Sequence, residues 1–563
     1  MKFVVTLCFA LLAGASASAK TPQPHHDRAM VDAANPLAVE AGLKVLRAGG
    51  SAADAAVAVQ ATLGLVEPQS SGIGGGAFLT YYDARTRAVT AYDGRETAPA
   101  SAAPKRFFGE DGKPLSFPQA VLSGRSAGVP GAVAMLALAQ KAHGRLAWAS
   151  LFSEGERLGR EGFIVSPRLA GLIAGGSAQA HAPDVVAYFT NMDGSRMKAG
   201  DRLVNRAYAA TLRKIAARGP AALLSGSVAA DIVARLNQDP LPGGMTLADL
   251  AAYRPHQSPA LCRPYRQLIV CEPGAPSGGV ATLEGLGLLE RTDIAARGPN
   301  DAQAWFELAQ AQRLMYADDL KYVGDPAFVR TPVTGLLDGA YLDARAKLIG
   351  DHAGPAPAPG KPVGAPAVGP DATREPGGTS SFVIVDQWGD VASMTTTVES
   401  VFGDGRMVDG FLLNNQLTDF SFQPLDKDGV AAANAVGPGK RPRSSMSPTI
   451  VLDKDHRFVM AVGSPGGMAI PAYVLKAVVG ALDWKLPMQD ALNLPNLIAI
   501  GDFFAGEADK FSPDVLKGLA DRGVVVRGGM GAEGSGLHGV ILRDGRLDGG
   551  ADTRREGVAR TCC

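Results

Sequence analysis

Residues 351–378 are the feature that most constrains how this 563-residue chain can fold. They are rich in Pro, Ala and Gly, and a segment of that composition buries too little apolar surface to offset the entropy lost on ordering it. An alternating strand pattern, TSSFVIVD, begins directly after it at Thr379. We therefore expect a flexible segment at 351–378 that divides the chain in two at Thr379.

The charge of the chain is balanced, with 55 Lys+Arg against 55 Asp+Glu. Nucleic-acid binders and polybasic membrane-surface proteins need a strong positive excess, so the composition argues against both classes. Hydrophobic residues make up 46% of the chain, which is ordinary for a globular protein and excludes wholesale disorder.

Residues 1–19, MKFVVTLCFALLAGASASA, have one basic residue, a short apolar run and small residues at the end. This layout is typical of a secretory signal peptide that is cleaved before Lys20. The alternative, a membrane anchor, needs about 20 apolar residues, and the run is shorter than that. We expect an exported protein, periplasmic or secreted, without a membrane anchor.

Four cysteines remain once Cys8 leaves with the signal peptide. Cys262 and Cys271 flank RPYRQLIV, where a turn at 263–266 would fold two strand-like arms together. In an oxidising compartment this pattern predicts a disulfide, although two free buried thiols remain the alternative. Cys562 and Cys563 have no evident partner. No His/Cys cluster has the spacing of a zinc site.

Helical patterns and hairpin patterns are interleaved along the chain. Helices are expected at 36–47, at 51–66 and over most of 132–348, and hairpins at 77–93, 379–398 and 449–463. Asn35 is expected to cap the first helix, and Ser51 is expected to open the second. Helices that flank hairpin-built sheets favour a layered α+β sandwich over a parallel βαβ fold.

Two common functional patterns, a nucleotide-binding loop and a serine triad, are not supported. The glycine-rich tract GIGGGAF at 72–78 follows a helix and precedes a strand, which is the reverse of a dinucleotide-binding loop, and SPGG at 464–467 lacks the Lys-Ser/Thr of a P-loop. A serine triad is disfavoured as well, because the chain has only eight histidines and several of them lie in evident loops.

Thr379 is a third candidate, because a hydroxyl residue that starts a strand after Gly-Gly fits an N-terminal nucleophile. In such a protein the chain cuts itself before the Thr, and the freed α-amino group acts as the general base for the hydroxyl. An α-amino group titrates near ~7.7–8.0, which suits neutral pH. Taken alone, however, the pattern fits an ordinary strand after a linker better.

The tracts around Thr379 resemble the γ-glutamyltransferase (γ-glutamyltranspeptidase) family. In chain order, these tracts are VEPQSSGIGGGAF, DGRETAPA, PSGG, GGTSSFVIVD, TTTVESVFG, LLNNQLTDF, ANAVGPGKRPRSSMSPTIV and GSPGG. The resemblance implies an N-terminal-nucleophile hydrolase with a four-layer αββα sandwich. It also implies a precursor that is cleaved between Gly378 and Thr379 into a large subunit, 20–378, and a small catalytic subunit, 379–563, which remain together as a heterodimer.

The resemblance also implies roles for the catalytic residues. Thr379 would be the nucleophile and, once freed, its own base, and the Thr397 hydroxyl would support it. The backbone N–H groups of Gly466 and Gly467 would form the oxyanion hole.

A second set of residues would bind the substrate's amino-acid end. Arg95 would grip the α-carboxylate, a task suited to its planar fork, and Ser444 and Ser445 would add hydrogen bonds. The residues implied for the α-ammonium group are Asp419, Gln416 and Glu399. The implied reaction transfers the γ-glutamyl group of glutathione, or of a related compound, through an ester on Thr379 to water, an amino acid or a peptide, and it requires no metal or organic cofactor.

The sequence departs from the family pattern in three places. The common Thr-Thr-His start is Thr379-Ser380-Ser381, Glu399 stands where many relatives have Asn, and the lid segment 420–434 is short and contains no Tyr. Two alternatives therefore stay open. One is a glutaryl or β-lactam acylase-like hydrolase on the same scaffold, and the other is a non-catalytic glutamate-binding relative.

Overall fold

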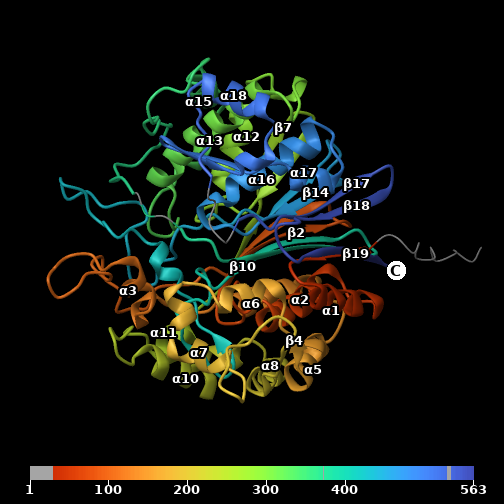
Figure 1. Ribbon diagram of the computed structural model, residues 1–563, viewed down its shortest axis with the longest axis vertical. Helices are drawn as coiled ribbons and strands as arrows, with labels where there is room; N and C mark the ends of the chain where they lie inside the picture. The colour runs from red at the N-terminus through yellow and green to blue at the C-terminus, as the bar shows by residue number, and fades with distance from the viewer. Residues whose placement is uncertain (1–28, 372, 374, 529–533) are drawn as a thin grey trace, which may run out of the picture.

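Two antiparallel sheets stack face to face between two layers of helices (Figure 1). The structure is a computed structural model that describes residues 29–371, 373, 375–528 and 534–563. Its αββα layering confirms the predicted α+β sandwich. The predicted signal peptide, 1–19, lies outside the described residues.

The first sheet has seven strands in the order β19-β1-β9-β10-β2-β3-β6, and the second has six in the order β18-β17-β14-β13-β8-β7. The strands of the first sheet are β1 (Ala29–Ala33), β2 (Gly76–Asp83), β3 (Ala88–Asp93), β6 (His256–Pro259), β9 (Ser380–Val385), β10 (Val391–Thr397) and β19 (Val558–Cys562). Those of the second sheet are β7 (Leu261–Tyr265), β8 (Leu268–Glu272), β13 (Thr449–Leu452), β14 (Phe458–Gly463), β17 (His538–Arg543) and β18 (Arg546–Ala551). Shorter strands are β4 (Phe163–Ile164), β5 (Arg202–Leu203), β11 (Met407–Val408), β12 (Phe411–Leu412), β15 (Leu497–Ile500) and β16 (Phe503–Gly506).

Helices from the first half of the chain pack against the seven-stranded sheet, in the lower part of Figure 1. This half contains α1 (Pro36–Arg47), α2 (Ala52–Val66), α3 (Phe117–Val121), α4 (Ala132–His143), α5 (Ser153–Glu161), α6 (Pro167–Ile173), α7 (Pro183–Tyr188), α8 (Arg206–Arg218), α9 (Ala221–Leu224), α10 (Ser227–Leu236) and α11 (Leu247–Ala252). The other layer contains α12 (Gly279–Leu289), α13 (Ala302–Tyr322), α14 (Val333–Leu336), α15 (Gly339–Ala346), α16 (Ile470–Val478), α17 (Met488–Asn493) and α18 (Pro513–Asp521). Across the part of the chain that the structure describes, no helix has both the length and the apolar character to cross a membrane.

The hydrophobic core follows the layers. Alternate residues of β9 divide between two clusters: Phe382 and Ile384 pack toward the helices around α2, whereas Val383 and Val385 pack between the two sheets. A third cluster joins the second sheet to α12, α13 and α16. Successive residues of β9 therefore point to opposite faces of the sheet, and both faces are buried.

The predicted helix starts are confirmed by their caps. The Asn35 side chain accepts a hydrogen bond from the N–H of Leu37, and Ser51 with Asp54 forms a reciprocal capping box at the start of α2. α2 is buried along its whole length, which explains why its sequence is apolar on every side.

The cysteine hairpin turns later than expected. Cys262 and Cys271 lie directly opposite each other, with their Cα atoms 4.1 Å apart, and a disulfide joins them. This register puts the turn at residues 266–267 rather than 263–266, because Pro264 lies within β7. β7 is an edge strand, where the missing N–H of a proline costs no sheet hydrogen bond. Cys562 and Cys563 are also joined to each other by a disulfide.

The Pro/Ala/Gly-rich segment forms no helix or strand over residues 351–371. Hydrogen bonds nevertheless connect it to α13: the N–H of Gly360 donates to Asp318 (2.6 Å), its carbonyl accepts from the Tyr322 hydroxyl (2.6 Å), and Arg313 donates to the Gly354 carbonyl (2.8 Å). The flexibility of 351–378 and the division of the chain at Thr379 stay predictions.

Replacing both Cys262 and Cys271 by Ala should lower the free energy of unfolding by about 2–3 kcal/mol, because the bridge closes a short loop in the unfolded chain. Denaturant unfolding of the oxidised proteins would measure the difference. Cys562→Ala with Cys563→Ala is the matched control, since a bridge between neighbours closes almost no loop. Equal losses from both double variants would contradict the prediction.

Candidate active site

Thr379 lies directly before β9, in the middle of the seven-stranded sheet, and is buried. β9 pairs with β10 so that Ser380 faces Thr396, which brings Thr379 to the end of β10. There its Oγ1 donates a hydrogen bond to Oγ1 of Thr397 (3.1 Å), and the Thr397 oxygen also accepts the N–H of Glu399 (2.7 Å). Strand pairing thus places the predicted nucleophile and its supporting hydroxyl side by side.

The backbone at Thr379 is strained. Its φ is 152°, a region that a β-branched residue rarely occupies. The preceding Gly378 has no room for a side chain, because a Cβ there would overlap the Glu399 carbonyl oxygen. The peptide bond between Gly378 and Thr379 is therefore held in a tight turn that depends on glycine on one side and stores strain on the other.

Gly466 and Gly467 lie between β14 and α16, against the same turn. Their φ values are 136° and 55°, and a side chain on Gly467 would overlap the carbonyl of Pro376. The N–H of the next residue, Met468, donates to the carbonyl of Glu375 (3.2 Å). Gly467 thus allows the backbone at Pro376 to pack closely on the segment that follows β14, whereas Gly466 leaves room for the Tyr473 ring.

Arg95 follows β3 and is fully buried. Its Nη2 donates to Oδ2 of Asp419 (2.6 Å) and to the carbonyl of Arg443 (2.5 Å), and its Nε donates to the carbonyl of Pro442 (3.2 Å). Asp419 belongs to the short helix η5 (Gln416–Asp419), which is also buried. The structure therefore brings together an ion pair whose members are 324 positions apart in the sequence.

Glu399 and Gln416 complete this cluster. Nε2 of Gln416 donates to Glu399 and also to Oδ2 of Asp419 (3.2 Å). Burial, together with the neighbouring charge of Asp419, raises the pKa of Glu399 well above its usual range. All three side chains predicted for an ammonium group therefore meet beside Arg95.

Four buried polar atoms of the cluster find no hydrogen-bond partner among the described residues. They are Nη1 of Arg95, Oε1 of Glu399, Oε1 of Gln416 and Oδ1 of Asp419. Leaving such atoms unpaired costs roughly 1–3 kcal/mol each, so native proteins keep few of them without a functional reason. One unused donor beside three unused acceptors complements a small ligand that carries one anionic and one cationic group.

Ser444 and Ser445 lie next to the Arg443 carbonyl that Arg95 binds. The N–H of Ser445 donates to Oε2 of Glu375 (2.8 Å), and Nε of Arg443 is 3.7 Å from the other oxygen of that carboxylate. Burial and the charge of Asp419 raise the pKa of Glu375 to about 7. Sequence reasoning missed Glu375, and its place three residues before Gly378 is the only signal that could have drawn attention to it.

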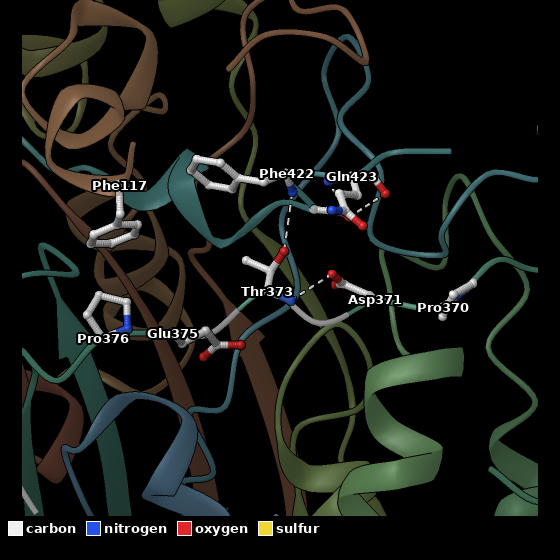
Figure 2. A pocket seen from close by; sticks show the side chains of 9 residues that line it. Phe117, Pro370, Asp371, Thr373, Glu375, Pro376, Phe422 and Gln423 are labelled. Carbon is white, nitrogen blue, oxygen red and sulfur yellow. Dashed lines mark hydrogen bonds between the residues drawn. The ribbon is translucent and has the colours of Figure 1, made fainter. Parts of the chain in front are cut away.

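A cavity of about 690 Å³ opens beside this turn. Figure 2 shows Glu375 and Pro376 on one side of it and the rings of Phe117 and Phe422 on the other. Phe422 stacks on Phe107 with ring centroids 4.9 Å apart, and its N–H donates to the Thr373 hydroxyl (3.3 Å). The predicted lid segment, 420–434, therefore lies against the residues that precede Thr379.

Arg555 is a second residue that sequence reasoning missed. It lies in the turn between β18 and β19, and its Nη1 donates to the carbonyl oxygen of Thr379 (2.7 Å). No local pattern in the sequence marks it, because its neighbour Arg554 is equally basic.

The chain matches known proteins over nearly all of its length. The family model described as gamma-glutamyltranspeptidase matches residues 38–562. The glutathione hydrolase proenzyme of Bacillus subtilis (strain 168) is 34% identical over 568 residues, which cover 96% of this chain and 94% of that protein. The glutathione hydrolase proenzyme of Escherichia coli (strain K12) is 35% identical over 575 residues, with coverages of 97% and 96%.

Among solved structures, the cephalosporin acylase from Bacillus halodurans superposes with a TM-score of 0.84 at 26% identity, covering 98% of this chain and 99% of that one. The fold is therefore shared with an acylase, and the sequence relatives include acylase proenzymes as well as glutathione hydrolase proenzymes. On these matches the chain belongs to the gamma-glutamyltranspeptidase family.

Proposed function

We propose that this protein transfers γ-glutamyl groups from glutathione or related compounds to water, amino acids or peptides, with Thr379 as an N-terminal nucleophile. The observation that carries the proposal is the set of unpaired atoms beside Arg95. An α-ammonium group has three N–H donors for the three free acceptors, and an α-carboxylate can accept from the free Nη1 of Arg95. Family membership supports the same assignment.

The nucleophile is released by self-cleavage. Oγ1 of Thr379 attacks the carbonyl carbon of Gly378, the C–N bond breaks, and the proton passes to the departing nitrogen. Water hydrolyses the resulting ester, which leaves a carboxylate on Gly378 and a free amine on Thr379. Because φ requires a preceding residue, cleavage also abolishes the strained torsion at Thr379.

Turnover then uses the freed amine as the base. It takes the proton of the Thr379 hydroxyl as Oγ1 attacks the γ-carbonyl carbon of the donor, and it returns the proton to the leaving amine. The N–H groups of Gly466 and Gly467 receive the negative oxygen, a contribution of roughly 3 kcal/mol for each donor. The remaining γ-glutamyl ester is opened by water or by an acceptor amine.

The processed enzyme is proposed to be a heterodimer of 20–378 and 379–563, exported after removal of 1–19. The likeness to a cephalosporin acylase makes a glutaryl acylase the second candidate. A glutaryl group carries the carboxylate but no ammonium group, so it would leave the acceptors of Glu399, Gln416 and Asp419 unpaired. The cluster therefore favours the γ-glutamyl donor.

Thr379→Ala should yield only the intact chain, whereas the wild type should give two fragments whose N-termini lie near Lys20 and at Thr379. N-terminal sequencing after a denaturing gel measures this. Thr379→Ser, which keeps a hydroxyl, should still be cut. Turnover of a γ-glutamyl anilide by an uncut wild-type chain would overturn the proposed function.

Glu399→Gln should lower kcat/KM for a γ-glutamyl anilide by about tenfold to a hundredfold, because it removes an ionisable partner of the ammonium group. Turnover of the matching glutaryl anilide should change little. Arg95→Lys should weaken both substrates, since both carry the carboxylate. The control is Glu307→Gln, a buried carboxyl on α13 outside the site. Equal losses on both anilides in Glu399→Gln would contradict the assignment of Glu399.

Uncut Thr379→Ala protein should bind free L-glutamate poorly, because the Glu375 carboxylate already holds the N–H of Ser445. Adding Glu375→Ala should tighten binding by roughly tenfold or more, the value of a charged hydrogen bond. Isothermal titration calorimetry on the two proteins measures the difference. Unchanged affinity would show that Glu375 does not compete for the carboxylate position.

A further inference from the structure

We infer that Arg555 is the positioning residue of Thr379, fixing its carbonyl group during self-cleavage and turnover. This inference rests on the proposed function, but no part of the catalytic chemistry described above uses Arg555. It starts from one contact: Nη1 of Arg555 donates to the Thr379 carbonyl oxygen at 2.7 Å, and Nη2 donates to the carbonyl of Gly534 at 3.3 Å.

The topology explains how a residue near the C-terminus reaches the nucleophile. β19 pairs with β1, and β1 pairs with β9, so that Val558 lies opposite Ala33 and Ala33 opposite Phe382. The turn that precedes β19 therefore lies at the same end of the sheet as Thr379. A Cβ on Gly536 would overlap the Arg555 side chain, so a glycine on the neighbouring loop leaves room for the guanidinium.

The hydrogen bond from Arg555 adds a third contact to two others that already hold Thr379. Its hydroxyl is bound to Thr397, and its nitrogen side is packed through Gly378 against Glu399. A strained φ persists only when the surroundings over-determine it, and the carbonyl is the remaining group by which the residue can be fixed. Holding that carbonyl restrains the Thr379 backbone against rotation about N–Cα, the torsion φ that together with χ1 sets the position of Oγ1 relative to the carbonyl carbon of Gly378.

After cleavage the same guanidinium has an electrostatic consequence. The new α-amine belongs to the residue whose carbonyl Arg555 binds, so the cation lies a few bond lengths away. A nearby positive charge disfavours the ammonium form and lowers its pKa, which makes the free base available at lower pH.

Other charged groups surround Thr379, and their contribution should be common to all Arg555 variants. On the α16 side stands Tyr473, and behind Arg555 the Arg554 guanidinium pairs with Glu507 and Asp552. On the other side stand Glu375, Glu399, Asp419, Arg95 and Arg443. Only substitution of Arg555 changes the charge bound to the Thr379 carbonyl itself.

Three variants of the full chain separate hydrogen bonding from charge. Arg555→Met removes both, Arg555→Gln keeps a donor without charge, and Arg555→Lys keeps the charge and a donor. We expect Arg555→Met to slow self-cleavage by about tenfold or more and Arg555→Lys to restore most of the rate. The fraction of intact chain on denaturing gels, followed over time, is the readout.

The pH profile of the cleaved proteins tests the electrostatic part. In Arg555→Gln the acidic limb of kcat/KM for a γ-glutamyl anilide should move up by about half to one pH unit, because loss of the cation raises the pKa of the α-amine. Arg555→Lys should keep the wild-type limb. Arg560→Gln is the control, since Arg560 lies on β19 but pairs with the surface residue Glu40.

The outcomes distinguish this inference from the proposed function. If the wild type cleaves and turns over, but Arg555→Met and Arg555→Gln cleave at its rate with an unmoved acidic limb, Arg555 does not position Thr379. If the wild type neither cleaves nor turns over, the proposed function fails first. Should Arg555→Met not fold, the Gln and Lys variants decide by the same two measurements.

Discussion

The pairing of β9 with its two neighbours determines where Thr379 lies and which residue meets its hydroxyl. β9 is hydrogen-bonded to β1 on one edge and β10 on the other, and a slip of one residue would turn Val383 and Val385 from the space between the sheets toward the helices. Because the side chains of each face pack into a different hydrophobic cluster, such a slip would disrupt the packing on both faces. Thr379, one residue beyond the strand, inherits that fixed position and meets Thr397 without any flexible element between them.

The buried polar cluster around Arg95 is better suited to specificity than to stability. Taking Arg95 and Asp419 out of water costs several kcal/mol, and their mutual attraction repays this only when the remaining polar atoms are also satisfied. Several of those atoms are not satisfied within the described chain. In the proposed function an incoming ammonium group completes the set and favours ionised Glu399, whose pKa burial otherwise raises. A ligand without an ammonium group would leave the desolvation of these buried groups uncompensated.

Local patterns in the sequence predicted most of the fold. Asn35 and Ser51 cap helices where expected, and the alternating strands pair as hairpins. The hairpin turn after Cys262 lies later than predicted because Pro264 is accommodated within β7. β7 can accept a proline because it is an edge strand, and its position at the edge is known only from the sheet order. The site differs: the assignment of Arg95 and Asp419 to one substrate-binding site came from family resemblance, since no spacing rule joins residues so far apart, and their direct contact emerged only in the structure. Glu375 and Arg555 were missed because their contacts with Ser445 and Thr379 are tertiary, and only the place of Glu375 near Gly378 could have drawn attention to either.

The backbone N–H of Ser445 has one partner in the uncut chain and would have another in the proposed enzyme. Before cleavage, Glu375 holds the N–H of Ser445, and the backbone at Pro376 lies on Gly467. If this segment leaves after the proposed cleavage, the N–H of Ser445 loses its partner, and a buried donor without a partner costs roughly 1–3 kcal/mol. A donor carboxylate that binds there recovers this energy. In the proposed function, departure of the segment and binding of the donor would therefore be coupled through one hydrogen bond, and a chain with a weaker contact at Glu375 would open more readily but would hold the scissile turn less firmly.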